Sequence, residues 1–243
     1  MINVKQFTFN PFQENTFVLF DDTNECVIID PGCHTREEET ELADFIAEQG
    51  LKPVRLISTH SHIDHVLGNY FVFKTYNLTP TIHNKDLDTL IRVKDYAHVY
   101  GFNDYQPSPE PTEFLIEKTN VQFGNSSLEV RFVPGHAPGH IVLVSMEDSF
   151  VINGDCLFYG SIGRTDLPGG DHETLLDSIR RELFTLPDHF VVYTGHGPST
   201  TIGFEKEHNP FCVKQKNPGS STRIFKKKRI IITPQLRLQP FLL

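Results

Sequence analysis

The sequence feature that most constrains this chain is a cluster of three histidines and one aspartate at 59–65, which reads Thr-His-Ser-His-Ile-Asp-His. The apolar run at 54–58 predicts a buried strand before it, and the residues from Val66 onward predict a helix. The cluster therefore falls on a turn, where side chains can converge. Three imidazoles and a carboxylate can supply ligands to more than one metal ion. A merely polar, histidine-rich turn is disfavoured, because unpaired polar groups beside a buried strand cost free energy.

Three later segments share a pattern, an apolar run that predicts a strand and is followed by a histidine or an aspartate. Glycine and proline around these residues fix the backbone and let a side chain reach inward. An α/β sandwich would gather residues at strand ends along one edge. The segments are 128–133 before Pro-Gly-His136, 150–153 before Gly-Asp155, and 190–194 before Gly-His196.

The opening of the chain, 2–30, predicts three strands joined by turns, and the third ends at Asp30 in an Asp-Pro-Gly sequence. Two roles of Asp30 stay open: it either orients a ligand histidine or forms the turn before the proline. Residues 35–49 predict an amphipathic helix with a capping box at its start. A second helix is expected at 66–76. The aromatic segment 95–111 is expected to be irregular and either covers the site or is a surface loop.

The Thr-His-x-His-x-Asp-His motif after a strand, followed by the later histidines and aspartate, resembles the metallo-β-lactamase superfamily, whose hydrolases include glyoxalase II. The resemblance implies an α/β fold, the αββα four-layer sandwich, with two sheets face to face and helices outside. We expect it to cover 1–213 as one metallohydrolase domain. By resemblance, one metal ion is held by His60, His62, His136 and Asp155, and a second by Asp64, His65, His196 and the same Asp155.

The resemblance also implies a mechanism with two divalent metal ions, for which zinc is expected and iron or manganese also suits the ligands. Two such ions about 3.5–4 Å apart can hold a bridging hydroxide at neutral pH. Asp64 is the expected catalytic residue, because it would bind the second ion and orient this hydroxide. A thioester suits such a site, since its thiolate leaves with a conjugate-acid pKa near ~8.5 and needs no strong general acid.

Two further segments, 163–172 and 203–211, resemble a short bacterial glyoxalase II-like subgroup, the hydroxyacylglutathione hydrolases. The expected function is therefore a thioesterase that cleaves S-D-lactoylglutathione or a similar acyl thioester, with this small molecule as its partner. Arg164 lies near the position where glyoxalase II enzymes place a basic residue that contacts glutathione. The tyrosine expected two positions later is Asp166 here, and an ion pair of Arg164 with a nearby aspartate is the alternative.

A different reaction class is the main rival. Persulfide dioxygenases share the Gly-Arg-Thr-Asp segment at 163–166 and most of the ligands, but they use one iron held by two histidines and an aspartate. The Gly-His-Gly-Pro segment at 195–198 favours the hydrolase. Hydrolysis of a lactone or a β-lactam on the same site is less favoured, and a binding role without catalysis is a distant third.

The charge distribution separates the last thirty residues from the rest. Eight of the 22 basic residues and none of the 31 acidic residues lie in 214–243, which leaves a net charge of −17 on 1–213. An acidic body argues against nucleic-acid binding. The basic tail at 214–243 resembles nothing in the family, and we expect it to be poorly packed and dispensable for activity. A nucleic-acid or targeting patch at 226–229 and an added edge strand or partner contact at 230–232 are the alternatives.

Location and redox state follow from simple features of the sequence. No apolar run approaches the roughly 20 residues that span a bilayer, and the start lacks the form of a signal peptide. We therefore expect no membrane partner and a cytoplasmic location. The four cysteines lack metal or disulfide spacing and are expected to be reduced thiols that mostly serve in packing.

Overall fold

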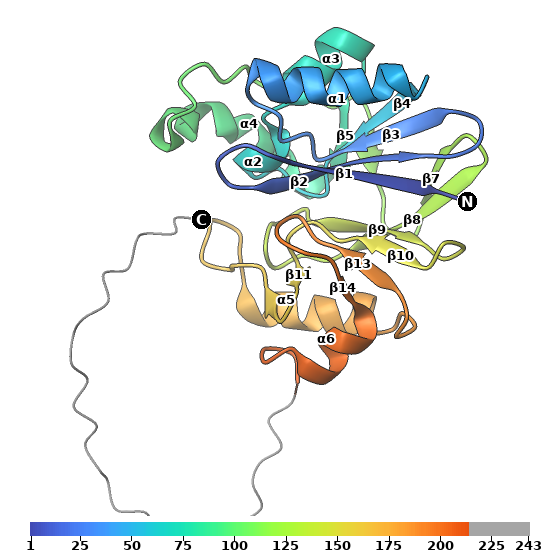
Figure 1. Ribbon diagram of the computed structural model, residues 1–243. Helices are drawn as coiled ribbons and strands as arrows, with labels where there is room; N and C mark the ends of the chain where they lie inside the picture. Colours follow the sequence, from blue (N-terminus) through green and yellow to red (C-terminus); the bar gives the residue numbers. More distant parts are fainter. Residues whose placement is uncertain (214–243) are drawn as a thin grey trace, which may run out of the picture. The chain divides into compact units, whose positions relative to one another are not determined.

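Two six-stranded sheets lie face to face within residues 1–213, the part of the chain that the computed structural model describes (Figure 1). Helices cover the outer face of each sheet, so the αββα sandwich expected from the sequence is confirmed. The expectations for the basic tail at 214–243 lie outside the described residues.

The first sheet uses its strands in chain order and contains the three strands expected in the opening segment. The strands β1 to β3 are antiparallel, and β3 to β6 are parallel. Helices connect β3 to β4 and β4 to β5, as parallel pairing requires. The strands are β1 (Asn3–Phe9), β2 (Glu14–Phe20), β3 (Glu25–Ile29), β4 (Lys52–Ile57), β5 (Pro80–His83) and β6 (Phe114–Leu115).

The second sheet comes from the second half of the chain, in the order β14-β13-β10-β9-β8-β7. Only β10 and β13 pair in parallel within this described sheet. A small hairpin of β11 (Leu157–Phe158) and β12 (Ser161–Ile162) follows β10. The strands of the sheet are β7 (Asn120–Phe123), β8 (Ser126–Phe132), β9 (Ile141–Ser145), β10 (Phe150–Ile152), β13 (Val191–Tyr193) and β14 (Thr200–Thr201).

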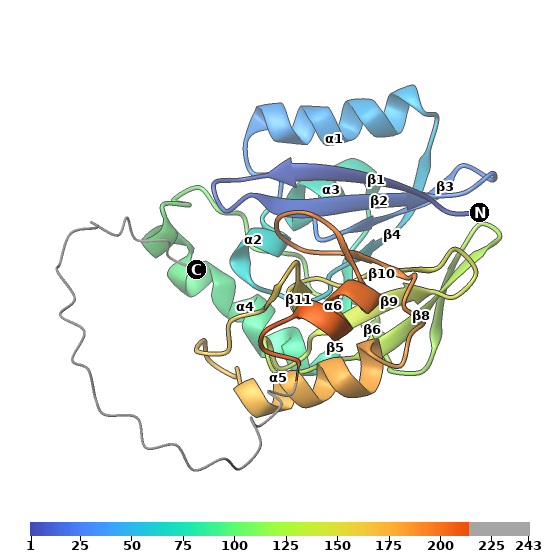
Figure 2. The ribbon, with the colours of Figure 1, turned by 60° about the horizontal axis from the view of Figure 1, so that its bottom comes forward.

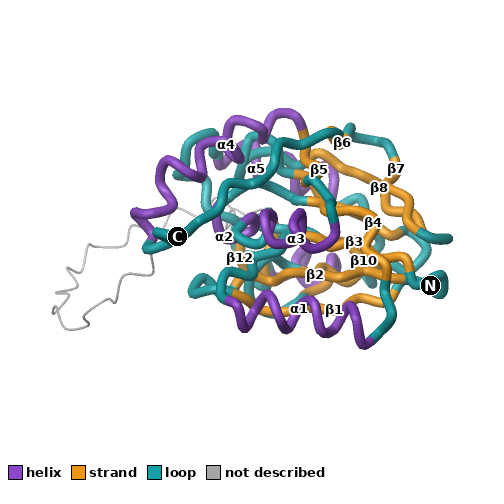
Figure 3. The backbone as a smooth tube through the Cα atoms, turned by 90° about the horizontal axis from the view of Figure 1, so that it is seen from above, coloured by secondary structure: helices purple, strands orange, loops and turns teal. Residues whose placement is uncertain are grey.

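The helices form the two outer layers. The helices α1 (Arg36–Glu48) and α3 (Asn69–Tyr76) lie over the first sheet (Figure 3), and α5 (His172–Ser178) and α6 (Ile202–His208) lie over the second (Figure 2). The predicted capping box of α1 is present. The Thr35 hydroxyl accepts from the Glu38 N–H, and the Glu38 carboxylate accepts from the Thr35 N–H.

The apolar residues fill three layers between these elements. Alternate residues of β2 show the division, because Phe17 and Leu19 pack between the sheets while Val18 packs toward α1. Strands with both faces covered bury side chains on both sides, which explains the continuous apolar runs in the sequence. The four cysteines are free and buried within residues 1–213. Among the described helices, none is long and apolar enough to cross a membrane.

The prediction of a single helix at 66–76 is wrong in one respect, because the structure has two helices there. The first, α2 (Ile63–Val66), ends before Gly68, and α3 begins at Asn69. The Gly68 N–H donates to the Pro31 carbonyl at 2.7 Å, which joins the break to the loop after β3. A Cβ atom at Gly68 would collide with the Cys33 sulfur. Close backbone packing therefore interrupts the helix.

The aromatic segment is also more regular than expected. The helix α4 (Leu87–Tyr96) lies between two 3₁₀ turns, Asn84–Asp86 and Ala97–Tyr100, so helical structure continues past Asp95. The reason is a buried face, since Val93 and Ala97 pack in the same apolar cluster at helical spacing. The segment is irregular only after Tyr100.

Candidate metal centre

The residues predicted as metal ligands come together at one edge of the sandwich. Asp64 and His65 lie on the short helix α2, and the others lie in loops that follow strands. Strand ends on both sheets thus supply side chains to one place, as the sequence pattern predicted. His60 and His62 follow β4, His136 follows β8, Asp155 follows β10, and His196 follows β13.

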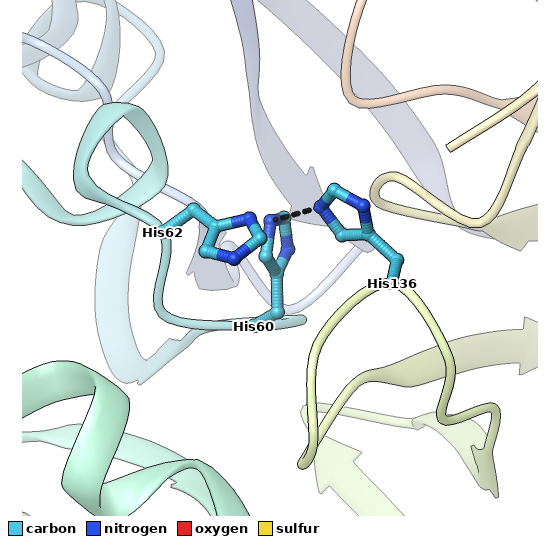
Figure 4. A group of neighbouring side chains, drawn as sticks. All are labelled: His60, His62 and His136. Carbon is cyan, nitrogen blue, oxygen red and sulfur yellow. Dashed lines mark hydrogen bonds between the residues drawn. The ribbon is translucent and has the colours of Figure 1, made fainter. Parts of the chain in front are cut away.

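Three imidazoles form the first group of donors. His60, His62 and His136 each offer a nitrogen within 4.8 Å of the other two. Their ring centroids lie 4.5–4.9 Å apart, and the rings turn toward one another (Figure 4). Three nitrogen donors on one side of a point are a common set for a zinc or related ion.

A second group lies beside the first and contains carboxylates. Asp64 Oδ2 lies 3.0 Å from His196 Nε2 and 3.6 Å from His65 Nε2. Asp155 lies between the groups, with carboxylate oxygens 3.5 Å from His65 Nε2, 3.4 Å from His196 Nε2 and 3.7 Å from His136 Nε2. A carboxylate shared by two ions has to lie in such a place.

Asp30 holds two of the histidines from behind. Its carboxylate accepts from the Thr59 N–H and the Thr59 hydroxyl, both at 2.6 Å, and lies 3.2 Å from His65 Nδ1. Because the Thr59 hydroxyl donates its hydrogen to Asp30, it accepts from His60 Nδ1 at 3.1 Å. Of the two roles left open by the sequence, the geometry supports orientation of histidine rings.

Carbonyl oxygens orient two more rings. His136 Nδ1 lies 2.8 Å from the Arg164 carbonyl oxygen, and His196 Nδ1 lies 3.1 Å from the Phe12 carbonyl oxygen. A carbonyl oxygen can only accept, so these partners assign a proton to Nδ1 of both rings. In a neutral ring, Nε2 then carries the lone pair that a metal ion binds.

These proton assignments test whether the first group fits a cation. His60 Nε2 and His136 Nε2 lie 3.3 Å apart, the contact drawn as a dashed line in Figure 4. Both nitrogens carry lone pairs when both Nδ1 atoms donate elsewhere, and two lone pairs at this distance repel each other. In addition, His65 Nε2 and Asp155 Oδ1 are buried without a hydrogen-bond partner within residues 1–213. The residues therefore fit bound metal ions.

The electrostatics differ between the two groups. Burial, with His65 and other imidazoles nearby, holds the pKa of His60 well below its ordinary value. Burial and His136 lower the pKa of His62 to about 3, so this group offers neutral nitrogens. Burial also opposes a charge on His196, but the carboxylates of Asp155 and Asp64 outweigh it and raise its pKa to about 10. The second group thus calls for positive charge, which a divalent cation supplies.

Two glycines allow this close packing. Gly154 has a left-handed backbone with φ of 51°, which turns the chain just before Asp155. A Cβ atom at Gly195 would collide with Asp155 Oδ1 and would approach His65 Cε1 to 2.9 Å. Any larger residue at Gly195 would therefore displace a candidate ligand.

The hairpin between β1 and β2 supports the centre in a way that sequence reasoning missed. Asn15 donates through its side-chain amide to the carbonyl oxygens of Thr194 and Gly197, at 3.0 and 2.9 Å. Asn10 donates in the same way to the Asp64 carbonyl oxygen at 3.0 Å. The sequence predicted only turns between the strands of 2–30, because these partners are distant along the chain.

A second missed residue binds the loop that carries His136. Asp86 is fully buried, and its Oδ1 accepts from the Gly139 N–H at 3.1 Å. Burial raises the pKa of Asp86, against the hydrogen bond from the Gly139 N–H that lowers it. The carboxyl thus links the 3₁₀ turn before α4 to the loop after His136. Nothing in the sequence around Asp86 indicated this partner, which lies 53 positions away.

The predicted substrate contact, Arg164, takes part in an ion pair. Its guanidinium donates to both carboxylate oxygens of Asp166, at 2.7 and 2.8 Å. The hydrogen bond to Asp166 raises the pKa of Arg164, and Tyr100 adds to the effect. The alternative interpretation of Arg164, a pair with a nearby aspartate, therefore describes this structure. Its side chain is still 31% exposed, which leaves part of the cation open to a ligand.

Aromatic side chains lie beside the second group of donors. The Phe12 carbonyl binds His196, and the Phe12 ring lies 5.9 Å from Tyr100 and 5.8 Å from Phe102. Burial raises the pKa of Tyr96, with smaller effects of Tyr100 and Asp64. Tyr100 is 39% exposed, so its ring is accessible beside Phe12.

The chain is similar to known proteins over nearly all of the described residues. The family model "Metallo-beta-lactamase superfamily" matches residues 9–196. "Probable metallo-hydrolase YqgX" of Bacillus subtilis is 37% identical over 205 residues, which are 83% of this chain and 93% of that protein. "Hydroxyacylglutathione hydrolase GloC" of Haemophilus influenzae is 34% identical over 215 residues, 86% of this chain and 98% of that protein.

A solved structure agrees with the sequence relatives. The crystal structure of TTHA1623 in a di-iron-bound form is 35% identical, with a TM-score of 0.77 over 86% of this chain and all of that one. Fold, site geometry and relatives thus point to the same family. The chain belongs to the metallo-beta-lactamase superfamily, whose members are generally hydrolases that bind metal ions.

Proposed function

We propose that this chain is a metal-dependent thioesterase of the glyoxalase II type with two divalent cations. The single observation that carries the proposal is the convergence of unpaired donor atoms, above all the two Nε2 atoms of His60 and His136 at 3.3 Å. Asp155 is in contact distance of both groups and would be shared. In the proposal, His60, His62, His136 and Asp155 hold one cation, and Asp64, His65, His196 and Asp155 hold the other.

Two bound cations supply an activated water at neutral pH and positive charge beside a substrate carbonyl oxygen. Asp64 is the catalytic residue in this proposal. Its Oδ2 lies at the centre, 3.0 Å from His196 Nε2, where the carboxylate can orient the attacking water and take up its proton. The leaving thiolate needs no proton from the protein, because a thiol has a pKa near ~8.5.

A thioester with a glutathione-like thiol is the proposed substrate, and S-D-lactoylglutathione is the first to test. The name of the Haemophilus influenzae relative, a hydroxyacylglutathione hydrolase, supports this class. Within the described part of the chain, the partly exposed Arg164 is a candidate contact for an anionic part of the thiol. The aromatic side chain of Tyr100 is a candidate contact for the acyl group.

The proposed cations are zinc ions, with iron or manganese as alternatives, since the donors are imidazole and carboxylate. The di-iron form of TTHA1623 makes iron the first alternative to test. A persulfide dioxygenase that uses one iron is the alternative function. The second group of donors, Asp64, His65 and His196, favours the hydrolase because one ion would leave it unused.

One experiment separates these functions. The purified chain is analysed for metal content and assayed both for hydrolysis of S-D-lactoylglutathione and for oxygen uptake with glutathione persulfide. We expect about two metal ions per chain and thiol release without oxygen uptake. One iron per chain with oxygen uptake and no hydrolysis would show that the proposed function is wrong.

A further inference from the structure

His140 is a buried histidine that the proposed chemistry does not use. It lies between the loop of His136 and β9, and its carbonyl oxygen accepts from the Val133 N–H at 2.9 Å. It lies directly before β9, which begins at Ile141. Its side chain is fully buried. A buried imidazole beside a polar centre needs a physical explanation.

The imidazole of His140 contacts two candidate ligands. Its Nε2 accepts a hydrogen bond from the Asp155 backbone N–H at 3.0 Å. Its ring stacks on the His60 ring, with centroids 4.8 Å apart and an angle of 27° between the planes. Because a backbone N–H can only donate, Nε2 carries the lone pair, and the proton of the neutral ring is on Nδ1. His140 is therefore turned with its acceptor toward the backbone of Asp155.

This contact fixes the turn that presents Asp155. Gly154 is in the left-handed region, and a Cβ atom there would approach His140 Nε2 to 2.8 Å, so the imidazole packs directly against the turn. The side chain of Asp155 must face both groups of donors at once. A rotation of its peptide would move the carboxylate away from one of them.

We propose that His140 is a positioning residue, which holds the backbone of Asp155 and the ring of His60 so that both metal ions can bind. The inference rests on the proposed two-cation centre. Groups that orient ligands from behind typically change metal affinity 10- to 100-fold when they are removed. His140 would differ from Asp30 in the way it acts. His140 holds the backbone N–H of Asp155 and stacks on the His60 ring, whereas Asp30 binds an imidazole N–H of a candidate ligand.

The test uses cobalt(II) as the probe and compares three substitutions. His140→Phe keeps a ring but removes the acceptor. His140→Gln places an oxygen near the position of Nε2, whereas the side chain of His140→Asn is too short to reach Asp155. A fourth variant, His83→Phe, is the matched control, because His83 is a buried histidine whose ring stacks on Phe132 instead of on a candidate ligand.

Cobalt(II) affinity and stoichiometry are measured by competition with a chelator, and the ligand-field absorption spectrum is recorded. Thermal unfolding of the metal-free proteins reports folding separately. We expect His140→Phe and His140→Asn to bind at least one cobalt ion 10- to 100-fold more weakly with a changed spectrum. His140→Gln should recover most of the affinity, and His83→Phe should match the wild type. If His140→Phe does not fold, the comparison of Asn with Gln decides.

Two results would overturn the inference. The first is normal cobalt affinity and an unchanged spectrum in folded His140→Phe or His140→Asn. The second is equal loss in His140→Gln and His140→Asn, which would make the acceptor irrelevant. Failure of the proposed function looks different, because the wild type would then hold one iron, take up oxygen and hydrolyse no thioester, whatever the cobalt affinities of the His140 variants. A wild type that binds no cobalt ions would overturn the inference as well.

Discussion

Asp21 gives the sharpest prediction about stability, because one buried carboxylate links the two sheets. It follows β2 and accepts from the N–H and hydroxyl of Thr23, and from the Asn125 N–H and the Ser126 hydroxyl at 2.7 and 2.8 Å. Asn125 lies in the turn between β7 and β8 of the other sheet, and Ser126 is the first residue of β8. Burial opposes ionisation, but these hydrogen bonds outweigh it and lower the pKa of Asp21 to about 2.

The size of the effect follows from this pKa. A fall from 3.8 to about 2 corresponds to roughly 2 kcal/mol, at ~1.4 kcal/mol per pKa unit. Solvent at the end of the sandwich weakens the contribution, so we expect Asp21→Asn to lower the free energy of unfolding by about 1–2 kcal/mol at pH 7. Because the pKa of Asp21 is lower in the folded than in the unfolded protein, the ionised carboxylate stabilises the fold above pH 3.8. This stabilisation is lost as the pH falls toward 2.

Urea unfolding of wild type and variant at pH 7 measures this difference. Asp22→Asn is the matched control, because it makes the same charge change at an exposed neighbour and should shift stability by less than ~0.5 kcal/mol. The difference between wild type and Asp21→Asn should shrink as the pH is lowered from 5 to about 2.5. Equal effects of the two substitutions, or an effect of Asp21→Asn that does not depend on pH, would refute the reasoning.

Three further predictions concern the centre. Asp64→Ala should reduce turnover of S-D-lactoylglutathione at least 1,000-fold, because a general base typically contributes ~10²–10⁴-fold to the rate. The circular dichroism spectrum should stay unchanged. Near-normal turnover would exclude the catalytic role of Asp64. Asn15→Ala should lower the free energy of unfolding by about 1–3 kcal/mol, because it leaves the carbonyl oxygens of Thr194 and Gly197 without their donor; a urea titration that matches the wild type would contradict this. Arg164→Ala should raise KM about threefold to tenfold with kcat unchanged, which steady-state kinetics would show; an unchanged KM would leave Arg164 only its ion pair with Asp166.

The fold and the candidate ligands were accessible from the sequence for one shared reason. Each candidate ligand follows an apolar run that predicts a strand, and the strands of both sheets end at the same edge. The prediction was wrong where a tertiary contact overrides a local pattern. The helix expected at 66–76 is broken by the contact of Gly68 with Pro31, and the segment after Asp95 stays helical because Ala97 is buried.

The sequence by itself determined which residue types can bind metal ions and in which order the strands deliver them, because both are local properties of short segments. Only the tertiary structure decided what holds those side chains in place. Asn15 binds Gly197 across 182 positions, Asp86 reaches Gly139 across 53, and His140 accepts from Asp155 across 15. Such partners are set by how the two sheets pack, and no periodicity along the chain records them.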